Sequence, residues 1–194
     1  MKAAKRMARA MLTILFSLML AIPVQAAESD PYDRVLEEVN NAYGTDLQMG
    51  YIDKGQVSPE EYYGFIEQVA KNSAETEEAI KNRHATEATN NYEIELYGGS
   101  KTVTKDAWGG WGNSFSITAR YSTDNMKIIG FNSASVNAKS PINFMYDPNV
   151  GSPTYTFIDA NRTLTVTFYG TVHNPSYTIT TPNVKLYAEF TATS

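Results

Sequence analysis

The sequence predicts an α+β protein in which a short helical segment precedes an antiparallel β-sandwich of the immunoglobulin-like or jelly-roll-like kind. Near residue 90 the spacing of apolar residues changes from helical to alternating, and turn residues then separate about eight short strands. Residues 27–94 carry 15 Asp and Glu against 5 Lys and Arg, whereas residues 95–194 carry 6 against 7. We therefore expect a signal peptide over 1–26, an acidic helical segment with a linker over 27–90, and a β-sandwich domain over 91–194.

The first 26 residues have the order of parts of a secretory signal peptide. Residues 1–10 hold four basic residues and no acidic one, residues 11–21 form an uncharged, mostly apolar run, and Pro23 precedes Val24-Gln25-Ala26. The apolar run is shorter than the roughly 20 residues of a membrane-spanning helix. We expect cleavage near Ala26, a secreted or extracellular location, and no membrane span in the mature chain.

Composition excludes several classes of chemistry. The chain has no cysteine, which rules out disulfides, thiol catalysis and cysteine-based metal sites. Its formal charge is −5, and the leader contributes four positive charges, so the remainder carries about −9. An acidic protein is a poor partner for nucleic acid or anionic membranes. No motif for a metal, a cofactor or a phosphate loop is present, and we expect none of these groups to bind.

Two helices are expected in the acidic segment. Asp30 and Pro31 suit a helix start, apolar residues recur at helical spacing from Tyr32 to Tyr43, and Gly44 suits a helix end. The second helix begins with a capping box, in which Ser58 is followed three residues later by Glu61. Its apolar face comprises Tyr62, Phe65, Ile66, Val69 and Ala70.

Residues 71–90 are mostly charged or polar, with few apolar positions. This pattern is typical of a solvated helix tail that leads into a linker. A helix that binds a partner is the alternative.

Strict alternation of apolar and polar residues predicts strands over 113–122, 161–173 and 184–190. We expect Phe115, Leu164, Val166 and Phe168 to be buried. Weaker strand patterns cover 91–97, 101–107, 126–131, 142–146, 154–158 and 177–180. On the opposite faces the sequence places threonines rather than charges, notably Thr163, Thr165, Thr167 and Thr171. Such a neutral face would suit an uncharged polar ligand, although β-branched threonine is also simply a good strand former.

The segment Trp108-Gly109-Gly110-Trp111-Gly112 holds both tryptophans of the chain. Glycines on both sides would let the backbone bend sharply and leave the rings poorly shielded. Exposed aromatic rings on a loop commonly stack on sugars or hold a protein partner, so Trp108 and Trp111 are the candidate ligand-binding residues. The alternative is that one or both rings fold inward, because tryptophan is usually well buried.

Catalytic groups are scarce, and we assign no catalytic residue. His84 and His173 belong to no metal or triad motif, and most aspartates of the second half lie in turn-like contexts. The sequence therefore favours a secreted, non-catalytic binding or surface-interaction protein with a glycan or an extracellular protein as its partner. Two alternatives remain: an extracellular hydrolase of polymers that uses His173 or a pair of carboxylates, and a self-assembling coat or matrix component.

Overall fold

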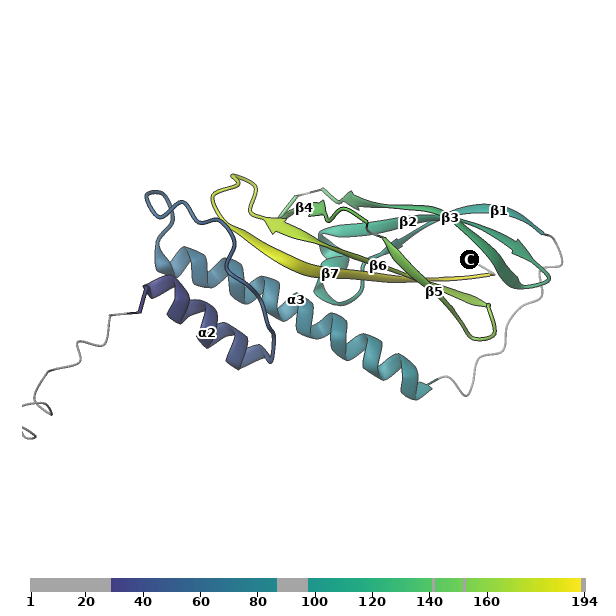
Figure 1. The fold of residues 1–194 in the computed structure, drawn as a ribbon, viewed down its shortest axis with the longest axis horizontal. Helices are drawn as coiled ribbons and strands as arrows, with labels where there is room; N and C mark the ends of the chain where they lie inside the picture. The colour runs from purple at the N-terminus through teal and green to yellow at the C-terminus, as the bar shows by residue number, and fades with distance from the viewer. Residues whose placement is uncertain (1–28, 87–97, 141, 152, 193–194) are drawn as a thin grey trace, which may run out of the picture. The chain divides into compact units, whose positions relative to one another are not determined.

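The computed structural model describes residues 29–86, 98–140, 142–151 and 153–192 (Figure 1). The predicted signal peptide over 1–26 and the predicted strand over 91–97 lie outside these residues. The described elements are α2 (Pro31–Tyr43), α3 (Pro59–Thr86), β1 (Gly99–Asp106), the 3-10 turn η1 (Gly109–Asn113), β2 (Phe115–Asp124), β3 (Lys127–Ala138), β4 (Met145–Pro148), β5 (Thr154–Ile158), β6 (Thr163–His173) and β7 (Thr180–Thr191).

The predicted fold class is confirmed: two helices precede two antiparallel sheets, with α3 running along the sheets in Figure 1. One sheet has the order β1-β2-β3. In the other sheet β6 pairs with β7 along its length, while β4 and β5 pair with its two halves. Because a strand has only two edges, β4 and β5 lie end to end on the edge of β6 that β7 leaves open. No described helix has both the length and the apolar character needed to cross a membrane.

The core of the sandwich follows the alternation of the two central strands. Phe115 and Ile117 of β2 are buried, as are Leu164, Val166 and Phe168 of β6. Each strand therefore buries one row of apolar side chains against the facing sheet, as the sequence predicted.

The two helices pack on each other through their apolar stripes. The rings of Tyr32 and Tyr62 meet edge to face with centroids 5.5 Å apart, and Val39 is fully buried. The predicted capping box is present, since the Ser58 N–H donates to Glu61 Oε2 at 2.8 Å and the Glu61 N–H donates to Ser58 Oγ at 3.2 Å. These bonds satisfy free N–H groups of the first turn and fix where α3 starts.

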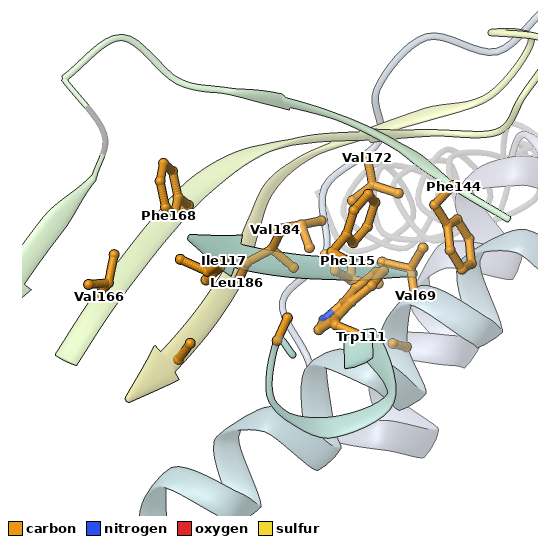
Figure 2. Packing of buried hydrophobic residues seen from close by; sticks show 14 of the residues in the cluster. Val69, Trp111, Phe115, Ile117, Phe144, Val166, Phe168, Val172, Val184 and Leu186 are labelled. Carbon is orange, nitrogen blue, oxygen red and sulfur yellow. The ribbon is translucent and has the colours of Figure 1, made fainter. Parts of the chain in front are cut away.

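The core is continuous from the sheets to the helices. Figure 2 shows this cluster with Val69 of α3, Trp111 of η1 and Phe115 of β2 among its members. The described residues from Pro31 onward accordingly form one compact unit. Full burial of a tryptophan removes about 150–250 Å² from water, which at about 25 cal/mol per Å² is on the order of 4–6 kcal/mol.

The turn η1 brings the sandwich into backbone contact with α3. Gly109 adopts a φ of 63°, and a side-chain carbon at this position would lie 2.6 Å from the Thr76 backbone nitrogen. A side-chain carbon on Gly110 would overlap Asn72 Oδ1. The Thr76 hydroxyl lies 2.9 Å from the carbonyl oxygens of both Asn72 and Trp108. Glycine is therefore required at both positions for the helix to come this close.

Gly109→Ala should lower the free energy of unfolding by about 2–4 kcal/mol. An alanine there would be strained in the left-handed backbone conformation, and its methyl group would clash with the backbone of α3. Gly130→Ala is the matched control, since nothing lies within 4 Å of an added carbon there. Urea unfolding of both variants checks this. Equal stability losses would contradict the role assigned to Gly109.

Stability should also fall at alkaline pH. Burial raises the pKa of Tyr62 to about 12, and burial alone raises that of Tyr121 to about 12, both from an ordinary value of 10.0. The unfolded chain releases these protons near pH 10, so the free energy of unfolding should decrease as pH rises from 10 towards 12. The Tyr62 hydroxyl has no hydrogen-bond partner among the described residues. Tyr62→Phe should therefore flatten this decrease without loss of stability at pH 7, in urea unfolding followed across the pH series. An unchanged slope would contradict the assignment.

Candidate functional site

The two predicted ligand-binding tryptophans face different elements. Trp111 is 0% exposed and packs against Phe115 and Phe144, with ring centroids 5.9 and 5.5 Å apart. Trp108 is half-buried and meets the ring of Tyr187 edge to face at 4.8 Å. The rings therefore do not form the shared exposed platform considered from the sequence. The glycines beside them serve the approach of η1 to α3, which carries the Trp111 ring into the core.

The long helix α3 leaves a cleft along each of its sides. Residues 68, 71, 72 and 75 lie on one side of the helix, and residues 73 and 77 lie on the opposite side at 3.6 residues per turn. A cylinder lying on a sheet leaves such grooves by geometry alone. The polar groups that line each cleft therefore decide which of the two is a candidate site.

The first cleft, which we call the amide cleft, has a cavity volume of about 520 Å³. This volume lies within the range of small-molecule sites, about 300–1,000 Å³. Its walls come from α3, from η1 and the residue after it, and from the segment before β4. They comprise Gly64, Phe65, Gln68, Lys71, Asn72, Glu75, Gly110, Asn113, Ser114, Asn143 and Phe144.

Most polar side chains of the amide cleft are not used by the fold. Within the described part of the chain, Lys71 and Glu75 form no ion pair, and the side chains of Asn113 and Asn143 form no hydrogen bond. Asn72 is only 2% exposed, and its Oδ1 accepts a hydrogen bond from Gln68 Nε2 at 3.0 Å. Uncommitted polar groups beside a buried, oriented amide are the arrangement expected of a ligand site.

Two phenylalanine rings complete the amide cleft. Phe65 of α3 and Phe144 lie with ring centroids 5.9 Å apart. Behind Phe144 lies Trp111, whose ring it meets edge to face. Trp111 therefore lies in the core and supports this wall of the cleft through Phe144. Figure 2 shows Trp111 and Phe144 among the buried core residues.

The second cleft, the tyrosine cleft, has a volume of about 480 Å³ and holds Tyr43 and Tyr169. Four of its polar side chains are paired with one another, whereas the buried hydroxyl of Ser73 has no hydrogen-bond partner within the described residues. Lys185 Nζ lies 2.8 Å from Glu77 Oε1, and Asn183 Nδ2 donates to Gln48 Oε1 at 3.1 Å. A ligand that used these four side chains would have to break their contacts, whereas most charged and amide side chains of the amide cleft have none to break, so we take the amide cleft as the candidate site.

His173, at the end of β6, forms a close pair with the carboxylate of Asp147. His173 Nε2 lies 2.7 Å from Asp147 Oδ2, and the ring of Tyr177 covers the imidazole at 4.8 Å. Neither ring nitrogen makes a well-directed hydrogen bond within the described residues. The arrangement therefore lacks the nucleophile–base hydrogen bond that covalent hydrolysis uses. The side chain of His84 lies outside what the structure describes.

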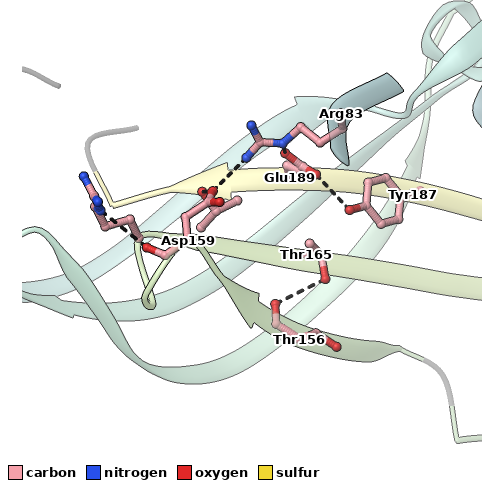
Figure 3. A network of polar contacts seen from close by, with 8 residues as sticks. Arg83, Thr156, Asp159, Thr165, Tyr187 and Glu189 are labelled. Atoms are coloured by element: carbon pink, nitrogen blue, oxygen red, sulfur yellow. Dashed lines mark hydrogen bonds and ion pairs between the residues drawn. The ribbon is translucent and has the colours of Figure 1, made fainter. Parts of the chain in front are cut away.

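The threonine row of β6 is covered at one end: Thr163 and Thr165 are buried, whereas Thr167 and Thr171 are half-buried. Thr163 is fully buried and Thr165 is 8% exposed. Thr163 Oγ1 donates to Asp159 at 2.6 Å, and Thr165 Oγ1 donates to the Thr156 carbonyl at 3.2 Å. These two hydroxyls are therefore used within the fold and are not open to a ligand; Figure 3 shows the contact between Thr165 and Thr156.

A partly buried charge network ties the end of α3 to the same sheet (Figure 3). Arg83 lies 2.8 Å from Asp159 through Nη2 and 2.6 Å from Glu189 through Nε. The Nε contact is a close charge pair rather than a well-directed hydrogen bond. Glu189 also accepts a hydrogen bond from the Tyr187 hydroxyl at 2.9 Å. One guanidinium contacts both carboxylates, so neither is free to act as one member of a catalytic pair.

Sequence reasoning missed every polar residue of the amide cleft. Gln68, Asn72, Asn113 and Asn143 are spread over about 75 positions, and amides have no characteristic spacing. The helical register set by Ser58 places Gln68 and Asn72 one turn apart on one face. This shared helix face was the one feature of the amide cleft that the sequence alone could have indicated.

Comparison with known proteins returned two solved structures and no match to a family model or to a curated protein. One is a two-domain protein of unknown function from Bacteroides thetaiotaomicron, 13% identical over 87% of each chain, with a TM-score of 0.33. The other is a hypothetical protein from Listeria monocytogenes, 13% identical, with a TM-score of 0.22. That match covers 51% of this chain and 82% of the other. Similarities this weak do not inform the function.

Arg83→Met should lower the free energy of unfolding by about 2–4 kcal/mol, because it leaves two poorly solvated carboxylates close together without a cation. Adding Glu189→Gln to this variant should recover part of the loss. Arg120→Met, at an exposed position of β2, is the control and should change stability by less than about 0.5 kcal/mol. Urea unfolding measures all three. Similar losses for Arg83→Met and Arg120→Met would show that the network contributes no more than a surface contact.

Proposed function

We propose that the protein is an exported, non-catalytic binding protein that holds a glycan in the amide cleft. The observation that carries this proposal is the set of amide and charged side chains in the cleft that have no partner within the described residues. The signal-peptide pattern of residues 1–26 supports export.

The chemistry of the cleft fits a neutral, hydroxyl-rich ligand. A side-chain amide both donates and accepts hydrogen bonds, as a sugar hydroxyl does. Lys71 and Glu75 bring opposite charges one turn apart, so the cleft has no excess of either sign. Phe65 and Phe144 provide apolar ring surface for the C–H groups of a sugar.

The two alternatives, a hydrolase and a self-assembling coat or matrix component, have weaker support. A hydrolase would use His173 or a carboxylate pair, but the His173–Asp147 pair has no nucleophile bonded to it in the described residues, and Asp159 and Glu189 share one arginine. Self-assembly through sheet edges has no contact in the structure to argue from. Both remain predictions of the sequence alone.

The test is binding of the purified protein to a glycan array, followed by calorimetric titration with the best ligand. A double variant, Asn113→Ala with Asn143→Ala, should weaken binding about tenfold or more, because two hydrogen bonds of about 0.5–1.5 kcal/mol are lost. Both residues are exposed, so the fold should be unaffected.

The control is Asn132→Ala with Asn149→Ala, which removes two exposed amides outside the cleft and should leave affinity unchanged. If both double variants bind equally well, the glycan lies elsewhere on the protein. The proposed function fails if the wild-type protein binds no glycan on the array.

A further inference from the structure

We infer that the amide cleft is one part of a longer groove, and that its glycan is a chain of several sugar rings instead of a mono- or disaccharide. This inference rests on the proposed function, because it names the size of the ligand that the same site would take. Three features lead to it: a second depression beside the amide cleft, a phenyl ring that borders both, and the length of helix that the two depressions cover.

The second depression, which we call the hydroxyl pocket, has a volume of about 290 Å³. It lies between the start of α3 and the loop that joins β6 to β7. Its walls comprise Gln56, Val57, Glu61, Phe65, Asn174, Ser176, Thr178 and Ile179. This volume is slightly below the roughly 300–1,000 Å³ of a complete small-molecule site, so the pocket suits one part of a larger ligand.

Phe65 connects the two depressions. Its side chain is half-buried and belongs to the walls of both the amide cleft and the hydroxyl pocket. Neither depression is enclosed, so a chain that fills one can continue over the Phe65 ring into the other. The ring offers apolar surface to the C–H groups of a sugar in the middle of that chain.

The combined groove is long. On α3, Glu61 lines the hydroxyl pocket and Glu75 lines the amide cleft. The helix rises about 21 Å between these two residues at about 1.5 Å per residue. A single sugar ring is much shorter than this, so a ligand that fills both depressions must be a chain.

The hydroxyls of the hydroxyl pocket are held in place by one amide. Asn174 Nδ2 donates to Ser176 Oγ at 3.2 Å and to Thr178 Oγ1 at 2.8 Å, while Asn174 Oδ1 accepts from the Ile179 N–H at 3.1 Å. Both hydroxyls are acceptors in these bonds, and their mutual contact at 3.4 Å can use only one of their two hydrogens. At least one hydroxyl hydrogen therefore has no acceptor within the described residues. A donor fixed in this way binds a sugar oxygen with a small ordering cost.

The experiment is calorimetric titration of the full chain with the best glycan of the array, supplied as a dimer and as a hexamer. We expect the hexamer to bind at least about tenfold more tightly, because it contacts both depressions at once. The double variant Ser176→Ala with Thr178→Ala should bring the affinity for the hexamer close to that for the dimer. The dimer fits within the amide cleft, so its affinity should not change, which also shows that the variant is folded.

The control is Ser133→Ala with Thr102→Ala, at exposed positions of β3 and β1, and it should keep the full preference for the hexamer. A longer chain also offers more binding registers to a dimer-sized site, but the Ser176 and Thr178 substitutions would not remove that gain. A preference that survives these substitutions would therefore overturn the inference.

Two further outcomes separate this inference from the proposed function. Equal affinities of the wild-type protein for the dimer and the hexamer would overturn the inference and leave the proposed function standing. Equal weakening of both oligomers by Ser176→Ala with Thr178→Ala, at unchanged stability in urea, would place the glycan in the hydroxyl pocket alone and would also overturn it. Failure to bind any glycan on the array would remove the proposed function together with this inference.

Discussion

Backbone contact between Gly109-Gly110 and the Asn72–Thr76 stretch of α3 holds the helical segment to the sandwich. Neither glycine leaves room for a side chain, and the Thr76 hydroxyl reaches the Trp108 carbonyl across the junction. On one side of this contact Trp111 fills the core, and further along the helix Arg83 joins the sheet through two carboxylates. The helix therefore lies in one register on the sandwich.

The amide cleft is a consequence of this contact. Its two walls come from α3 and from the segments around η1 and Phe144, so the positions of its amides depend on how closely the helix approaches. A looser interface would separate Asn72 from Gly110 and release the Gln68–Asn72 pair. Preorganised polar groups on rigid elements bind with less ordering cost than the same groups on free loops.

The parts of the fold that depend on local periodicity could be predicted from the sequence. The capping box at Ser58 and the alternating rows of β2 and β6 were found this way, because each depends on residues close together in the chain. The polar stretch after Lys71 was expected to be a solvated tail. In the structure Asn72 and Thr76 are buried and Arg83 is paired, since polar contacts rather than an apolar stripe dock this part of α3. Hydropathy carries no signal for such docking. It carries none either for a cleft whose amides come from three separate segments of the chain.

Side-chain amide NMR during titration with the best glycan ligand of the array tests directly whether the amide cleft is the binding site. We predict that the NH2 resonances of Asn72, Asn113 and Asn143 shift with a common saturation curve while those of Asn132 and Asn149 stay in place. The opposite pattern, with shifts confined to Gln48 and Asn183 of the tyrosine cleft or absent from all of these amides, would contradict binding in the amide cleft.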